Sequence, residues 1–549
     1  MNEITTGKGQ GAGMTSEQRK RLGRRDFLRR GAVVTAVAGV GTAAGGTLMA
    51  NAVSGQSGPG LAQLPLSDSV DYTTMPSVRL IATDGHFSFP GRRFANDNSL
   101  FGFGFRAVDD LRLQSAGGEL DLNPGDLIDK YKGKVLQTAP TIVGIEGIEM
   151  AIVVTNLGLL ARPDLDDAHS LHWHGFRNAT AVFDGVPETS ISVPSGRDLP
   201  YFYDPKTQNE PGQNKGSAGT YMYHCHFEDT EHVEMGMTGI IFVEPFDMWF
   251  TGSVGNWLPQ RRKVAYNDNA AGVDSSFDRE FALLMSEIDS TPHDNLEAVQ
   301  EFVWSDYAPN YWTINGRSYP DTVIPQITPS EQVDAYTPDG LFVQTNYAEP
   351  AQMPVTPGTA DEAAEAEMLW QHNSSLIQCR EGERVLLRIA NLGYEVHSIE
   401  AVGLDLDIIA HDASLLIGKN GTSDLTYTTR RIELGPGEAR DVLFDVPAYD
   451  DSTAVVDTIA TKTGKIRKYN RYLLKSRNNH RNSNDGLTDG ADGVSYAAAG
   501  DTYGGMVTEV WVYPTLADAA LPSINQDGLP DQTTINETFP TLVVPAGHV

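Results

Sequence analysis

Two short strings hold most of the chemistry that this chain can perform. The first reads His-Ser-Leu-His-Trp-His over residues 169–174, and the second reads His-Cys-His over residues 224–226. In an extended strand, successive side chains point to opposite faces. His172 and His174 therefore share a face, whereas Cys225 points away from the two histidines that flank it. One strand can thus serve one cluster through Cys225 and another through its neighbours.

The residues around Cys225 fit a copper of the blue type. Such a centre takes two imidazoles, one thiolate and a weak axial thioether. Four residues supply this set: His169, Cys225, His232 and Met237. Met235 is the alternative axial ligand. Zinc also accepts Cys and His, but a single thiolate among many imidazoles with a trailing methionine favours copper. The sequence therefore predicts a blue-copper site at Cys225.

The remaining histidines of the two strings form a second, all-imidazole set. Its members are His172, His174, His224 and His226. Neutral imidazoles suit a copper that also meets oxygen-derived ligands. The sequence therefore predicts two metal sites on opposite faces of one strand.

An internal repeat predicts the fold class. Residues 146–158 (Glu-Gly, an alternating strand, then Asn-Leu-Gly) match residues 381–393, and Gly236-Met237 before an apolar strand matches Gly505-Met506. Short β segments dominate and helix signals are few. We expect an all-β protein made of two tandem β-sandwiches. The repeat alignment takes residues 441–444 as the counterpart of the His-Cys-His strand.

The predicted domains follow from this repeat. The first spans residues 53–249 with the blue-copper site, the second spans residues 250–515, and residues 516–549 form a Pro/Asp-rich tail. Residues 1–52 contain paired arginines, Arg24-Arg25, before a mild apolar run and an Ala-Asn-Ala cleavage site, which is typical of a twin-arginine export signal. We therefore expect a periplasmic or secreted protein that is not bound to a membrane once the signal is removed.

Charge excludes one class of partner. The formal net charge is −31 at pH 7, and a surface this acidic argues against nucleic acid as a partner. Two cysteines, Cys225 and Cys379, are too few for a disulfide scaffold.

The two strings resemble the copper-binding motifs of multicopper oxidases of the laccase-like type. The resemblance covers about residues 140–515 and implies two cupredoxin-like Greek-key β-sandwiches. The two-domain layout also resembles small two-domain laccases and copper nitrite reductases, which implies a homotrimer with copper sites between subunits. It implies a type 1 blue copper at Cys225 and a type 2 or type 2/3 copper site at the other histidines.

Domain 2 departs from the family pattern. A full trinuclear cluster in that family takes further histidines from His-x-His pairs, and no such pair follows residue 226. His397 is the candidate ligand from a neighbouring subunit, with core packing as the alternative, and His411 is a weaker one. Nitrite reductases carry an Asp where this chain has His172 and a catalytic His where it has Tyr311, which ranks nitrite reduction lower.

The resemblance also indicates the reaction. A phenolic or metal-ion reductant would give single electrons to the blue copper, and dioxygen would be reduced at the second site. Asp184, in an Asp-Gly turn, resembles the family's proton-carrying carboxylate, and Glu188 is a weaker candidate. The alternatives are a copper nitrite reductase and a non-catalytic blue-copper electron carrier or copper-binding protein.

Overall fold

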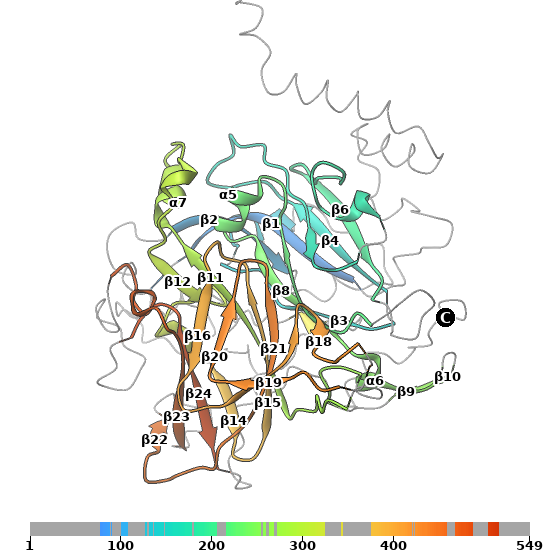
Figure 1. Cartoon of the computed structure of the whole chain (residues 1–549). Coiled ribbons are helices and arrows are strands. Elements are labelled where there is room, and N and C mark those ends of the chain that lie inside the picture. Colours follow the sequence, from blue (N-terminus) through green and yellow to red (C-terminus); the bar gives the residue numbers. More distant parts are fainter. Residues whose placement is uncertain are drawn as a thin grey trace, which may run out of the picture. The chain divides into compact units, whose positions relative to one another are not determined.

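The computed structural model describes residues 77–514 with gaps (Figure 1). The longest gaps are 90–99, 108–126, 206–215, 324–341, 344–374, 458–466 and 487–502. All described residues belong to a compact unit that spans residues 72–549. The predicted export signal (1–52) and tail (516–549) lie outside the described residues. Within the described part, none of the helices has the length and apolar character that crossing a bilayer requires.

Domain 1 is a sandwich of two sheets. The first has the strand order β2-β1-β4-β6: β1 Ser77–Phe87, β2 Leu100–Ala107, β4 Met150–Asn156 and β6 Arg197–Tyr203. The second has the order β13-β3-β8-β7-β5: β3 Ile142–Ile145, β5 His172–His174, β7 Gly219–His224, β8 Thr238–Glu244 and β13 Phe342–Val343. β4, β7 and β8 are buried along their whole length. The His-Cys-His string therefore begins at the end of a strand in the middle of a packed layer.

Domain 2 repeats this plan. One sheet follows the order β12-β11-β15-β21-β17-β18, with β19 paired to β17: β11 Arg279–Ile288, β12 Tyr311–Ile314, β15 Arg384–Asn391, β17 Leu406–His411, β18 Ser414–Leu415, β19 Tyr427–Thr429 and β21 Ala439–Asp445. The other follows β14-β24-β23-β16-β20, with β22 paired to β23: β14 Ile377–Arg380, β16 His397–Ala401, β20 Arg431–Leu434, β22 Val455–Asp457, β23 Arg467–Ser476 and β24 Val507–Tyr513. Aliphatic side chains from both sheets fill the core between them.

Helices are few and short among the described residues. They are η4 Ala181–Phe183, α5 Asp229–Glu234, α6 Phe246–Trp249, α7 Ser290–Glu297, η5 Trp304–Asp306, η6 Asp321–Val323 and η8 Asn479–Arg481. A hairpin of β9 Phe250–Ser253 and β10 Asn256–Pro259 follows domain 1. The predicted all-β fold class of two tandem cupredoxin-like sandwiches is confirmed.

The central strands of the two domains match, and this corrects one prediction. β1 runs parallel to β4 as β11 runs parallel to β15, and β3 runs parallel to β8 as β14 runs parallel to β24. β21 pairs with β15 as β6 pairs with β4. Residues 441–444 are therefore not the counterpart of the His-Cys-His strand. That counterpart is β23, which lies between β24 and β16 as β7 lies between β8 and β5. The many Arg and Lys residues of β23 hid its strand pattern in the sequence.

Domain 1 and domain 2 share buried contacts beside β7. Leu386 and Leu443 of domain 2 join an apolar cluster with Ile145 and Ala218 of domain 1. The Thr220 hydroxyl donates to Asp441, which also accepts from Tyr266. Polar groups so deeply buried are tolerated because they are paired. Domain 2 thus fixes the strand that leads to Cys225.

Candidate metal centre

β5 and β7 bring the two histidine strings together. They pair antiparallel, with His172 opposite His224 and Trp173 opposite Tyr223. Trp173 is fully buried against the aromatic rings of Phe176 and Tyr203, whose centroids lie 4.1 and 4.5 Å away. Because side chains alternate across a strand, burying Trp173 on one face directs His172 and His174 to the other.

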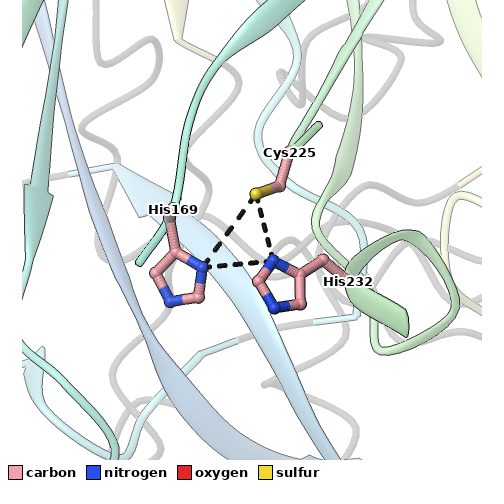
Figure 2. A group of neighbouring side chains, drawn as sticks. All are labelled: His169, Cys225 and His232. Atoms are coloured by element: carbon pink, nitrogen blue, oxygen red, sulfur yellow. Dashed lines mark hydrogen bonds between the residues drawn. The ribbon is translucent and has the colours of Figure 1, made fainter. Parts of the chain in front are cut away.

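Three predicted blue-copper residues converge at the end of β7 (Figure 2). The Sγ of Cys225 lies 3.1 Å from Nδ1 of His232 and 4.0 Å from Nδ1 of His169, and the two Nδ1 atoms are 3.4 Å apart. A trigonal metal with bonds of about 2.0 to 2.3 Å needs ligand atoms about 3.5 Å apart. We call these three residues the Cys225 cluster, and their donor atoms fit one metal ion without rearrangement.

The surroundings of Cys225 favour a thiolate. Burial raises the pKa of the thiol, but the neighbouring His232 and His169 imidazoles outweigh burial and lower the pKa to about 5. The N–H of Ser170 also points at the sulfur, 3.3 Å away. A thiolate is the form that binds metal. Cys225 is therefore prepared for metal binding at neutral pH.

The two methionines lie on the connection that follows α5. Met237 is fully buried, and its carbonyl accepts a hydrogen bond from the N–H of Cys225 at 3.1 Å. Met235 is also buried, but its carbonyl accepts from Phe103 of β2. Met237 is thus the methionine that is tied directly to Cys225, and its role as axial ligand stays a prediction.

The other histidines form a second group, the four-histidine cluster (His172, His174, His224 and His226). Ligand atoms of the first three lie within 4.8 Å of one another. The ring centroid of His226 is 5.3 Å from that of His172 and 5.4 Å from that of His224. The structure therefore brings all four rings together on the face opposite Cys225.

Hydrogen bonds fix two of these rings. His172 Nδ1 donates to the carbonyl of Asp184 at 2.6 Å, and His224 Nδ1 donates to the carbonyl of Cys225 at 2.9 Å. This leaves Nε2 of each ring for a metal. Burial and the neighbouring imidazoles lower the pKa of His224 to about 3, and burial and His172 lower the pKa of His174. His224 and His174 are therefore neutral at pH 7, as metal binding requires.

The two predicted proton carriers differ in position. The Oδ1 of Asp184 lies 3.3 Å from Nδ1 of His172, next to the four-histidine cluster. Glu188 is exposed on the following turn. Only Asp184 is therefore in contact with a predicted ligand.

His397 does not lie where the prediction needs it. It is fully buried, its Nε2 is 2.6 Å from Glu287 and its Nδ1 is 3.0 Å from Arg481. Both ring nitrogens therefore have partners within this chain, and the ring is not exposed to a neighbouring subunit. The alternative of core packing, with both ring nitrogens hydrogen-bonded, describes it. His411, half-buried, contacts the hydroxyl of Tyr427 at 3.1 Å.

Two residues at the sites were missed in the sequence. Asp167 lies 3.0 Å from Nε2 of His232, on the side away from Cys225. Its position two residues before His169 was the available signal. Gly437, on a turn of domain 2, lies against His174: a Cβ there would be 3.0 Å from Nε2. No sequence signal singled it out among the 54 glycines.

Gly437→Ala is expected to weaken metal binding at the four-histidine cluster. The new methyl group would press on His174, and shifts of this kind around a ligand cost about 10- to 100-fold in metal affinity. Gly421→Ala is the matched control, because Gly421 has a similar φ (+71° against +77°) and open space around its Cα. Both variants lose about 1 kcal/mol of stability through the positive φ. Copper retained after dialysis against a chelator separates them, and equal retention would contradict the contact.

Comparisons with known proteins agree with this chemistry. The family model for multicopper oxidases matches residues 132–247. Laccase-1 from Cryptococcus neoformans var. neoformans serotype D (strain B-3501A) is 37% identical over 68 residues, and the match spans 12% of this chain and 10% of that relative. The chain thus covers about a tenth of this curated relative's length.

A blue copper oxidase from Nitrosomonas europaea has a TM-score of 0.45 at 17% identity and covers 82% of this chain and 93% of its own. A copper nitrite reductase from Nitrosomonas europaea has a TM-score of 0.41 at 15% identity and covers 83% of this chain and 99% of its own. The sequence match is the more specific finding: residues 132–247, which carry both histidine clusters, match the family model for multicopper oxidases, and copper is the metal that this match indicates.

Proposed function

We propose that the protein is a laccase-like copper oxidoreductase that takes single electrons from a reductant at the Cys225 cluster and reduces dioxygen at the four-histidine cluster. One observation carries this proposal. The two clusters lie on opposite faces at the end of β7, and the peptide bond between His224 and Cys225 joins them directly. A copper bound at each cluster would supply one-electron redox chemistry.

The Cys225 cluster provides the entry side for electrons. Cys225 contributes the thiolate, and His169 and His232 contribute imidazole nitrogens. Asp167 holds the far nitrogen of His232, so that Nδ1 faces the sulfur. A carboxylate in this position orients the ring and raises its basicity. The proposed reductants are phenols or reduced metal ions, and the net charge of −31 favours cations.

The four-histidine cluster provides the side for dioxygen. Asp184 holds His172 through its backbone carbonyl, and its carboxylate lies 3.3 Å from the same nitrogen. A carboxylate at this place can carry protons toward the cluster, since oxygen reduction consumes them. We therefore assign Asp184 the proton role and leave Glu188 as an exposed second carboxylate.

The setting of the enzyme is part of the proposal. The paired arginines and apolar run of residues 1–52 support export by the twin-arginine route to the periplasm or beyond. A homotrimer is proposed by analogy with two-domain copper proteins. Nucleic acid is not proposed as a partner because of the acidic charge.

Copper stoichiometry with electron paramagnetic resonance on the purified holoprotein tests this function. We expect more than one copper per chain, a blue-type signal, and oxygen consumption with a phenolic dye. Nitrite turnover without oxygen consumption would replace the proposal with a nitrite reductase. About one copper per chain without oxygen consumption would indicate that the protein is an electron carrier instead.

A further inference from the structure

Domain 2 contains a counterpart for each residue of the blue-copper set, and backbone hydrogen bonds identify them. In domain 1 the N–H of Cys225 donates to the carbonyl of Met237 at 3.1 Å. In domain 2 the N–H of Ser476, at the end of β23, donates to the carbonyl of Met506 at 3.0 Å. Because β23 is the counterpart of β7, Ser476 takes the place of Cys225 and Met506 takes the place of Met237.

The same connection identifies the counterpart of His232. The N–H of Met237 donates to the carbonyl of His232 at 2.9 Å, and the N–H of Met506 donates to the carbonyl of Arg481 at 2.9 Å. His232 lies on α5, and Arg481 lies on η8, which is likewise a short helix directly after the strand. Arg481 therefore stands where domain 1 has its second imidazole.

His397 is the counterpart of His169. His169 forms a bridge with Val193, whose carbonyl accepts from the side chain of Asn156. His397 pairs with Leu434, whose carbonyl accepts from the side chain of Asn391. Each histidine is followed by a serine, and Asn156 and Asn391 end matching strands of the repeat.

The guanidinium of Arg481 lies where domain 1 has its second imidazole donor. In domain 1 the Nδ1 atoms of His169 and His232 are 3.4 Å apart, facing Cys225. In domain 2 Nδ1 of His397 is 3.0 Å from Nη1 of Arg481. We infer that His397, Ser476, Arg481 and Met506, here called the Arg481 cluster, are the domain 2 counterpart of the blue-copper set, in which a serine and an arginine replace two ligands and the guanidinium supplies the positive charge.

Charge explains why this replacement is stable. A Cu(II) ion with one thiolate carries a net charge of +1, and so does a guanidinium beside a serine. Arg481 also bonds to Glu395 at 2.9 Å, and the far nitrogen of His397 is held by Glu287 at 2.6 Å. All four members of the cluster are buried, so these carboxylates balance a charge that would otherwise be costly. Domain 2 therefore binds no copper at this position, and His397 is a structural residue.

Restoring the missing ligands is the direct test. The double substitution S476C/R481H in the full-length chain supplies the thiolate and second imidazole. We expect one additional copper per chain and a second thiolate-to-copper absorption. The same pair is then made in a Cys225→Ser background, where the only blue absorption expected is that of domain 2. This arm works even if domain 1 binds no copper, so failure of the inference and failure of the proposed function are distinguishable.

The matched control is Ser476→Cys alone. It restores the sulfur but keeps Arg481 in place of the second imidazole, and we expect no added copper. Added copper in this single variant would overturn the inference, because Arg481 would then not prevent metal binding. A double variant that has the wild-type Tm and gains no copper would also overturn the inference.

A second measurement decides the matter if the double variant does not fold. Arg481→Gln leaves Glu395 and the Nδ1 of His397 without their cationic partner and should lower Tm by roughly 10 °C. Adding Glu395→Gln should restore part of that loss, and copper content should stay at the wild-type value in both. A wild-type Tm for Arg481→Gln, or a loss of copper, would refute the assignment.

Discussion

Replacing Cys225 with serine is expected to abolish the blue absorption, to remove one copper per chain and to lower oxidase activity at least about a hundredfold. The reason is the loss of the thiolate. The pKa of Cys225 falls to about 5 beside His232 and His169, so the sulfur is ionised at neutral pH. A serine hydroxyl stays protonated and offers a hard oxygen, which is a poor ligand for a blue-type centre. Absorption spectroscopy and copper analysis of the purified variant measure both effects.

Cys379 provides the matched control. It is also a buried free cysteine, but it lies in β14 of domain 2, where burial raises the pKa of its thiol. Its Sγ is 3.7 Å from the carbonyl of Trp511. Cys379→Ser should keep the full blue absorption and copper content. A Cys225→Ser protein that remains blue would refute the assignment of the site.

The sequence predicted the Cys225 cluster because its information is local. His224, Cys225 and His226 are consecutive, and the alternation of a strand alone separates their faces. His232 follows on a one-turn helix, α5, so its approach to the sulfur depends on a short stretch of chain. Strand spacing and ligand preference were therefore sufficient to predict that Cys225 and His232 meet, whereas His169 lies 56 residues before Cys225 and was added because a blue-type copper needs a second imidazole.

The roles of domain 2 could not be predicted in the same way. His397 was a candidate ligand because the sequence alone does not distinguish a histidine that binds a metal from one that contacts an arginine. Only the pairing of β23 with β16 and β24 reveals that Arg481 lies beside it. Asp441 was assigned to the wrong strand because buried alternation in β21 resembles that of any core strand. Long-range register decides these contacts, and a single sequence does not specify it.

The surroundings of the four-histidine cluster determine which of its histidines should be replaced to test the oxygen site. His174 is the ring of the cluster that faces domain 2 at Gly437, whereas His224 is bonded to the carbonyl of Cys225. Replacing His224 would therefore disturb the Cys225 cluster as well. His174 is the substitution that separates the two sites.

His174→Ala is expected to stop oxygen reduction while leaving the blue centre intact. Removing the His174 imidazole from the cluster removes a ligand without touching the thiolate. Anaerobic reduction by a phenolic dye should bleach the blue absorption as in the wild type. Reoxidation in air should slow at least about a hundredfold, since a lost ligand costs no less than a lost outer-sphere contact. Stopped-flow absorption follows both half-reactions separately.

His86→Ala is the control for this variant, because His86 is a partly exposed imidazole paired with Glu297 at 2.8 Å and far from either string in sequence. It should leave both half-reactions unchanged. If His174→Ala reoxidises at the wild-type rate, the four-histidine cluster is not the oxygen site. If it instead loses the blue absorption, the two clusters are not independent, and the separation by the faces of β7 would be wrong. The expected split, with reduction kept and reoxidation lost, requires two distinct sites, one on each face of β7.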